Sequence, residues 1–557
     1  MKKLIALVLV LVLCLAAFSG CKDVYSDPSS GIKDISVEDA LSEMNALLSN
    51  VKVSSKDAPI DISALEEVSE ADALADISTF PIMVTGNGQI DIEIAAATEM
   101  SADSPDDWLN VVARKFNKAG VTVNGKSVSV SVRKITSGEV LTYMVNGGYR
   151  PDVYIPSNYA WGKMLESNFE VTTLSDRIAG NTAGILMKRS VYDSYIEKYK
   201  EVSVGKVLDA TLAGDLVFAY TNPYTSSTGL NILTAMLNYF DPNDPVSENA
   251  SQKLVEYQKK SPPVAYTTAV LRNSAAKGVI DAMVMEEQSY INTPELKDYV
   301  YTPQGIRHDH PVYTFDYVSD EKVEAAKAFV NYCLTDECQQ LANERGFNRH
   351  DDYKGVDPGL SGSEYLMAQK VWKQNKNGGQ PVIAVFVADT SGSMGGTPLR
   401  SLQQSLISAS TYIGSENYIG LISYSDSVTI NLPIDEFTPT QRAKLTGAVK
   451  QLSASGGTAT YDAVLEGIKL LLDKQKEVPD AKLMLFVLSD GEQNMGVKYD
   501  RITSIVKALS IPIYTIGYNM SSTDELKALA SINEAALINA SSDDVVNQLR
   551  NLFNTQL

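Results

Sequence analysis

The sequence predicts an α/β protein with two folded domains, and three observations support this prediction. Apolar runs of strand length alternate with amphipathic helical stretches through most of the chain. The stretch from about residue 80 to 370 is long enough for a two-lobed domain. Residues 378–557 repeat the alternation as a doubly wound, Rossmann-like sheet should.

The last third of the chain gives the clearest order of elements. Strands are expected at residues 382–387, 418–424, 428–432, 483–488, 511–516 and 536–538. Helices are expected at residues 399–413, 459–472 and 545–553. This order places helices between strands, so both faces of the sheet would be covered.

Polar side chains follow two of these apolar strands. Asp389, Ser391 and Ser393 occupy alternate positions after the first strand, Asp490 follows a later one, and Thr458 opens the helical run between them. Because ligands gather beyond the carboxyl ends of strands in open sheets, we expect these loops to meet at one edge. Carboxylate and hydroxyl oxygens are ligands that suit Mg²⁺, Mn²⁺ or Ca²⁺.

This pattern resembles the metal-ion-dependent adhesion site (MIDAS) of von Willebrand factor A (VWA) domains, over residues 378–557. The resemblance implies that the Ser391 and Ser393 hydroxyls bind a divalent cation and that Thr458 binds it directly or through water. Asp389 and Asp490 would act mostly through water. The remaining coordination position would take an acidic group from a protein partner. The alternative is a metal-free domain whose hydroxyls cap helices.

Between residues 80 and 370 the expected elements again alternate. Strands are expected at 89–97, 128–135, 150–157 (with its exit loop), 216–220 and 279–284, and helices at 107–116, from 136, from 226 and at 321–333. The order and several short motifs, among them Pro151-Asp152-Val153 and Ser226-Ser227-Thr228-Gly229, resemble the solute-binding proteins of ABC transporters. The resemblance implies two lobes, with the chain crossing between them near residues 180 and 285 and a ligand cleft between them.

Hydroxyl side chains at predicted helix starts make a candidate ligand site in this cleft. Free backbone N–H groups and the helix dipole would favour a small anion there, although ordinary helix capping explains the same residues. An acidic side chain after the strand at 279–284 would instead suit a cation or sugar hydroxyl, so the ligand stays open. The candidate residues are Ser137, Ser157, Ser226, Ser227, Thr228, Gly229 and Glu286.

The N-terminus predicts export. Two lysines precede an apolar run, and small residues lead to Cys21, which resembles a bacterial lipoprotein signal over residues 1–20. Cleavage would leave Cys21 to carry lipid and anchor the protein on the outer or periplasmic side of a cell membrane. A transmembrane helix is the alternative, but the run is short. Residues 21–79 are predicted to be an acidic tether with a local helix capped at Ser36, or an extension of the next domain.

Composition excludes some partners and leaves other features undecided. A formal net charge of −20 disfavours binding to nucleic acid. Cys333 and Cys338 could form a disulfide across a helix break, or remain buried thiols. His308 and His310 could point the same way in a strand, but a third metal ligand is not evident, and His350 is expected at the surface without a partner.

No constellation of catalytic residues stands out in the sequence, so an enzyme is not expected. We expect a binding protein in which the C-terminal domain recognises a partner through the cation. The first domain would sense a small ligand or serve as a scaffold. The alternative is the substrate-binding component of an ABC transporter whose VWA domain is a docking module.

Overall fold

The computed structural model describes most of the chain. The described residues are 32–65, 74, 76–260, 264–265, 271, 275, 280–491, 493–518, 524–533, 537–540 and 545–557. The predicted signal segment 1–20 and the lipidation at Cys21 lie outside them. No helix among these residues has the length and apolar character needed to cross a membrane.

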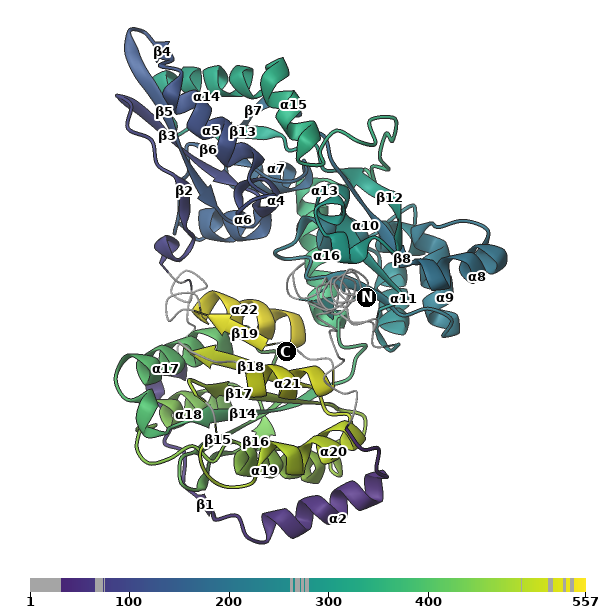
Figure 1. Ribbon diagram of the computed structural model, residues 1–557, viewed down its shortest axis with the longest axis vertical. Helices are drawn as coiled ribbons and strands as arrows, with labels where there is room; N and C mark the ends of the chain where they lie inside the picture. Colours follow the sequence, from purple (N-terminus) through teal and green to yellow (C-terminus); the bar gives the residue numbers. More distant parts are fainter. Residues whose placement is uncertain are drawn as a thin grey trace, which may run out of the picture.

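The fold class is confirmed as α/β, with a two-lobed domain followed by a doubly wound one (Figure 1). The first lobe is a mixed sheet in the order β2-β5-β3-β6-β13-β7, with β4 paired to β5. Its strands are β2 (Ile82–Val84), β3 (Ile90–Ala96), β4 (Thr122–Val123), β5 (Lys126–Lys134), β6 (Val153–Ile155), β7 (Val171–Ser175) and β13 (Val312–Phe315). Its helices are α4 (Thr98–Ser101), α5 (Trp108–Lys118), α6 (Ser137–Val145), α7 (Ala160–Leu165), α14 (Asp320–Cys333) and α15 (Asp336–Glu344).

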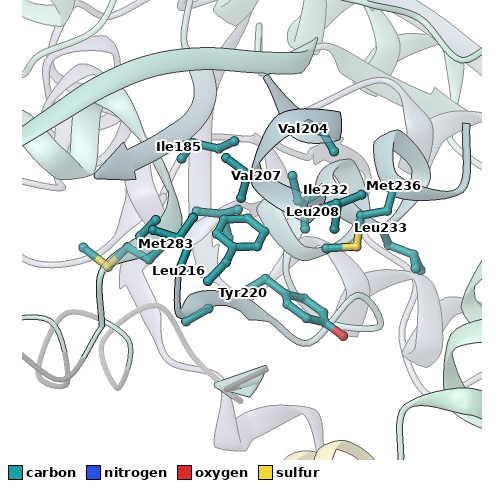
Figure 2. Packing of buried hydrophobic residues seen from close by; sticks show 14 of the residues in the cluster. Ile185, Val204, Val207, Leu208, Leu216, Tyr220, Ile232, Leu233, Met236 and Met283 are labelled. Atoms are coloured by element: carbon teal, nitrogen blue, oxygen red, sulfur yellow. The ribbon is translucent and has the colours of Figure 1, made fainter. Parts of the chain in front are cut away.

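The second lobe is a sheet in the order β10-β9-β11-β8-β12. Its strands are β8 (Thr182–Lys188), β9 (Phe218–Thr221), β10 (Val264–Ala265), β11 (Ala282–Glu286) and β12 (Tyr299–Arg307). Its helices are α8 (Arg189–Tyr199), α9 (Val204–Ala213), α10 (Ser227–Phe240), α11 (Glu248–Gln258) and α13 (Glu287–Ile291). Strand residues such as Tyr220 and Met283 share one apolar core with Leu233 and Met236 of α10 (Figure 2).

The chain crosses between the lobes twice. The first crossing, between Ser175 and Thr182, lies near residue 180 as expected. The expected crossing near residue 285 is wrong, because β11 is followed by β12 in the same sheet and the chain returns only after Arg307. Helix α16 (Gly362–Asn375) then packs against α7 of the first lobe and against α10 and α11 of the second, and leads into the C-terminal domain.

The C-terminal domain has a sheet in the order β1-β16-β15-β14-β17-β18-β19, in which only β15 and β16 pair antiparallel. Its strands are β14 (Val382–Asp389), β15 (Tyr418–Tyr424), β16 (Val428–Glu436), β17 (Lys482–Ser489), β18 (Ile513–Tyr518) and β19 (Leu537–Ala540). Its helices are α17 (Thr397–Ser410), α18 (Pro439–Lys450), α19 (Thr460–Gln475), α20 (Tyr499–Leu509), α21 (Asp524–Ile532) and α22 (Val545–Gln556).

Alternation along β14 shows why this sheet is covered on both faces. Its even-numbered residues, such as Phe386, pack in a core with α17, α18 and α22. Its odd-numbered residues, such as Val385, pack in a second core with α19, α20 and α21. Period-two side chains that are apolar on both faces are typical of a central strand in a doubly wound sheet.

The predicted tether is wrong for residues 32–65, which join the C-terminal domain. Helix α2 (Val37–Leu48) is capped by the Ser36 side chain and buries Ala40 and Met44 in the core beside α20. Strand β1 (Val53–Ser55) pairs parallel with β16 and forms the edge of the sheet. The apolar residues scattered through this segment therefore cover a domain that begins some 300 residues later in the chain.

Cys333 and Cys338 are free thiols, so the candidate disulfide is not formed in this structure. Cys333 ends α14 and Cys338 lies in α15, after the helix break that the sequence suggested. Both side chains pack in the apolar core of the first lobe, and burial raises the pKa of the Cys333 thiol. Buried thiols in such surroundings are inert.

Candidate functional site

The five predicted metal-site residues come from three loops of the C-terminal domain. Asp389 is the last residue of β14, and Asp490 directly follows β17. These two strands pair parallel as far as Ala388 and Leu488, so their carboxyl ends lie side by side. Thr458 lies in the loop before α19.

A continuous series of hydrogen bonds connects four of these residues. The Ser391 backbone N–H donates to Asp389 Oδ1 at 2.8 Å, and the Ser391 and Ser393 hydroxyls lie 3.0 Å apart. The Ser393 hydroxyl donates to Asp490 Oδ1 at 2.8 Å. The two serine hydroxyls thus lead from the end of β14 to the carboxylate that follows β17.

The loop that carries Thr458 joins this group through the backbone. The N–H of Gly392 donates to the carbonyl of Gly456 at 3.0 Å. Asn494 then orients Thr458, because its Oδ1 accepts from the Thr458 N–H at 2.9 Å and its Nδ2 donates to the Thr458 hydroxyl at 3.3 Å. Asp426, in the turn between β15 and β16, accepts from the Gly457 N–H at 2.6 Å.

Burial disfavours the charged form of both carboxyl groups, Asp389 and Asp490. Burial raises the pKa of Asp389, although the Ser489 hydroxyl donates to its Oδ2 at 2.5 Å. Burial raises the pKa of Asp490 too, and the negative charge of Asp389 adds to that rise. Among the hydrogen bonds and ion pairs of the described residues, neither carboxylate has a basic partner.

These features fit a hard divalent cation. Carboxylate and hydroxyl oxygens are the ligands that Mg²⁺ and Ca²⁺ prefer, and a cation would relieve the repulsion between Asp389 and Asp490. The described residues contain no group of three or more His, Cys, Asp or Glu side chains that could hold a metal, here or elsewhere, so a cation at this edge would depend on the hydroxyl oxygens. The role of the five residues as a metal site stays a prediction.

Three residues that contact this group were not predicted. Ser489 directly precedes Asp490 and points to Asp389, so its place in the Ser489-Asp490 pair was the available signal. Asn494 and Asp426 lie on loops whose approach depends on the fold, and the sequence carried no signal for them.

The cleft residues predicted in the first domain meet one another. Ser227 donates to Ser137 Oγ at 3.2 Å, and the Ser137 and Ser157 hydroxyls lie 3.5 Å apart. The Trp161 indole N–H donates to Ser227 Oγ at 2.9 Å. All four side chains are buried, and they link the first lobe directly to α10 of the second.

The start of α10 is capped by its own residues. Ser226 Oγ accepts from the Gly229 N–H at 3.3 Å, as an N-cap does. The Thr228 hydroxyl lies 2.8 Å from Ser226 Oγ and 3.1 Å from the Thr221 hydroxyl. Gly229 lies close to the end of β9, since a Cβ there would be 2.3 Å from the Thr221 carbonyl oxygen.

The buried side chains of His308 and His310 each pair with a carboxyl group near the second crossing between the lobes. The Glu286 carboxyl lies 3.3 Å from Nδ1 of the buried His308. His310 lies 3.1 Å from the Glu99 carboxyl. His350 was expected to have no partner, and this expectation is wrong, because its Nε2 lies 3.2 Å from the Glu287 carboxyl and its ring stacks on Tyr301.

The two lobes also touch through their backbones, and we call this contact the lobe seam, formed by residues 137–139 and 222–227. The Gly138 N–H donates to the Thr225 carbonyl at 3.3 Å across it. A Cβ on Gly138 would lie 1.9 Å from the Tyr224 carbonyl oxygen, so only glycine allows this approach. The lobes are therefore closed directly on each other.

Family comparisons identify two known domains in this chain. A model for the von Willebrand factor type A domain matches residues 384–554, and a model for bacterial extracellular solute-binding proteins matches residues 97–348. The resemblances to a VWA domain and to bacterial solute-binding proteins are thereby confirmed, whereas the metal-ion-dependent site stays a prediction. Together they describe a binding protein with a protein-interaction module.

The curated relatives share only part of the chain. Inter-alpha-trypsin inhibitor heavy chain H3 of Mesocricetus auratus is 30% identical over 151 residues, which cover 25% of this chain and 17% of the relative. Heavy chain H4 of Sus scrofa is 25% identical over 39% of this chain and 26% of the relative. The chain thus spans about a fifth of the length of these relatives.

Solved structures resemble each domain separately. A von Willebrand factor type A protein from Catenulispora acidiphila gives a TM-score of 0.29 at 17% identity, covering 31% of this chain and 42% of that one. Iron-bound HitA from Pseudomonas aeruginosa gives 0.38 at 15% identity, covering 52% and 99%. With scores this low, the residues of this chain must carry any functional proposal.

Proposed function

We propose that this protein recognises an acidic group of a protein partner through a divalent cation held by its VWA domain. The observation that carries the proposal is the convergence of Asp389, Ser391, Ser393 and Asp490, with the Thr458 loop, at one edge of the sheet. A bound Mg²⁺, Mn²⁺ or Ca²⁺ would supply an electrophilic centre for an outside carboxylate.

Each residue has a stated task in this proposal. The Ser391, Ser393 and Thr458 hydroxyls hold the cation, and they bring no negative charge of their own. Asp389 and Asp490 orient the serines through the hydrogen bonds above and provide charge at a distance. A site with few direct protein charges leaves the cation free to attract an anion from a partner. The protein acts by binding rather than by catalysis.

We further propose that the protein works outside the cytoplasm and is anchored by lipid at Cys21. The match to extracellular solute-binding proteins supports an extracytoplasmic location, and the signal-like residues 1–20 support the anchor. The first domain acts as a scaffold that presents the VWA domain. Its candidate ligand residues, among them Ser137, Ser157 and Ser227, already bond to one another, which favours a scaffold over a sensor of a small solute.

The test is binding to carboxylate-bearing peptides. The full chain is applied to an immobilised set of short peptides, each with one glutamate or with glutamine in its place, in Mg²⁺ and in EDTA. We expect retention that needs both Mg²⁺ and the glutamate and that is lost in Ser393→Ala. The matched control is Ser453→Ala, an exposed serine of the same domain. Equal retention in EDTA, or by the glutamine peptides, contradicts the proposal.

A further inference from the structure

The last helix of the VWA domain, α22, reaches both lobes of the first domain (Figure 1). On the first lobe, Arg550 pairs with Glu139 of α6. On the second lobe, the Asn222 Nδ2 donates to the Thr555 hydroxyl at 2.9 Å, and the Gln556 side chain donates to the Val264 carbonyl at 3.1 Å. Helix α22 therefore bridges the two lobes, which meet at the lobe seam.

The ion pair at the centre of this contact is buried. The side chains of Arg550 and Glu139 are 5% and 2% exposed. Burial alone would lower the pKa of Arg550, but the Glu139 carboxylate outweighs it and holds that pKa above its usual value. The guanidinium also lies over the rings of Tyr143 and Tyr412, 5.7 and 6.0 Å from their centroids. Breaking such a pair leaves an uncompensated buried charge.

Two of the three attachment points of α22, Glu139 and Asn222, lie at the lobe seam itself. Glu139 follows Gly138, whose N–H crosses the seam to Thr225. Asn222 organises the opposite side, because its carbonyl accepts from the Ser226 N–H at 3.0 Å and its side-chain oxygen accepts from the Tyr224 N–H at 2.9 Å. Separation of the lobes would move these two anchors apart.

Helix α22 cannot follow both lobes at once, because it is fixed to the VWA sheet. Leu549, Leu552 and Phe553 are fully buried in the core of that domain, and the Phe553 ring lies 5.0 Å from that of Phe386. The junction is tightened by Lys373 of α16, which donates to the Asn554 carbonyl at 3.0 Å. Opening the lobes must therefore break at least one anchor of α22.

We propose that the seam of the solute-binding-like domain is a docking surface for α22 of the same chain, and that this helix clasps the two lobes in their closed arrangement. The partner at this surface is thus internal: a helix bearing a buried arginine, matched to the Glu139 carboxylate, and a hydroxyl matched to Asn222. Closure of the lobes and docking of α22 stabilise each other, so loss of either weakens the other by the same factor.

Hydrogen exchange on the full chain in detergent tests this linkage in one direction. In Arg550→Met, the peptides covering 136–146 and 222–230 should exchange faster by about tenfold or more, because the seam opens locally. Peptides from the cores of β3 and β14 should keep their wild-type rates. The matched control is Arg501→Met, an exposed arginine of the VWA domain. Seam exchange within about twofold of wild type, while the 548–557 peptide is deprotected, overturns the proposal.

The reverse direction uses a change that does not touch α22. Gly138→Ala forces the seam apart, since its Cβ would meet the Tyr224 carbonyl. The 548–557 peptide should then exchange faster although its own sequence is intact, and the β14 peptide should not change. This variant also decides the matter if Arg550→Met does not fold. An open seam with wild-type protection of α22 overturns the proposal.

Discussion

The metal-site edge of the VWA sheet and the lobe seam both collect buried polar groups, but they treat charge differently. At the seam, Arg550 and Glu139 neutralise each other, and the serines of the two lobes share hydrogen bonds. At the edge of the sheet, Asp389 and Asp490 lie close together with raised pKa values, and no described basic side chain pairs with them.

The difference indicates where each region finds its partner. The charges of Glu139 and Arg550 compensate each other, so this pair needs no counter-charge from outside. One oxygen of that carboxyl group and one guanidinium nitrogen still have no hydrogen-bond partner among the described residues. Two carboxylates whose pKa values are raised by burial, one of them also by the charge of the other, are stabilised by an added cation. This difference supports the two proposals, an internal partner for the seam and an external one for the edge of the sheet.

The largest effect is expected from Glu139→Gln, which leaves the Arg550 charge buried without its partner. Removal of one member of a buried ion pair costs about 3–5 kcal/mol of unfolding free energy. Urea unfolding followed by tryptophan fluorescence reports the stability of the first domain, because the cores of its two lobes contain Trp108, Trp161 and Trp372.

Glu166→Gln is the matched control for that variant, since Glu166 is an exposed glutamate of the same lobe. A loss below about 1 kcal/mol for Glu139→Gln, similar to that of an ordinary surface change, would show that the seam does not depend on the pair.

At the edge of the sheet, Ser393→Ala should weaken metal binding but leave the unfolding free energy nearly unchanged, in contrast to Glu139→Gln at the seam. We expect at least about 100-fold weaker Mn²⁺ binding, because even residues one shell out from a metal cost about 10–100-fold. The unfolding free energy without metal should change by less than about 1 kcal/mol. Titration of free Mn²⁺ by electron paramagnetic resonance measures the affinity, with Ser453→Ala as the control. Unchanged Mn²⁺ affinity in Ser393→Ala would remove this serine from the site.

Asn494 should contribute less to Mn²⁺ affinity than Ser393, and only by orienting Thr458. Asn494→Ala frees the Thr458 hydroxyl from its orienting bond, so we expect about tenfold weaker Mn²⁺ binding in the same titration. In a Thr458→Ala background the substitution should have little further effect. The full tenfold loss in that background would mean that Asn494 acts by another route.

The smallest effect concerns the junction, where burial lowers the pKa of Lys373 to about 7. Between that value and its ordinary value of 10.5, the unfolded chain binds more protons than the folded one. Unfolding free energy should therefore rise with pH above 7, by at most about 1.4 kcal/mol per pH unit from this group. Lys373→Met should flatten the rise, measured by urea unfolding at pH 7, 8 and 9. The exposed Lys370→Met should not, and equal slopes in both variants would contradict this account.

Local patterns predicted the elements that bury their own apolar residues. The strand expected at 418–424 is β15, and the helix expected to be capped at Ser36 is α2. The destination of α2 could not be predicted, because Ala40 and Met44 complete a core whose other members lie far along the chain. Periodicity shows which face of a helix is apolar, but not which surface it covers.

Spacing also predicted the five residues at the edge of the sheet, since each lies at the end of an apolar strand or the start of a helix. The seam shows the limit of that reasoning. Arg550 and Glu139 are 411 residues apart, and nothing near either residue indicates the other. Ser137, Ser226 and Ser227 lie at helix starts as predicted, yet the bonds among the cleft serines depend on closure of the lobes.

The most direct test of the comparison is calorimetric titration of Mg²⁺ into the metal-stripped full chain, with Asp389→Ala alongside. The account predicts saturable binding at one site in the wild type and none in the variant. It also predicts weaker binding as the pH falls, because protons compete for carboxylates whose pKa values are raised. Absence of saturable binding from a folded wild-type chain, or equal binding in Asp389→Ala, would contradict the account.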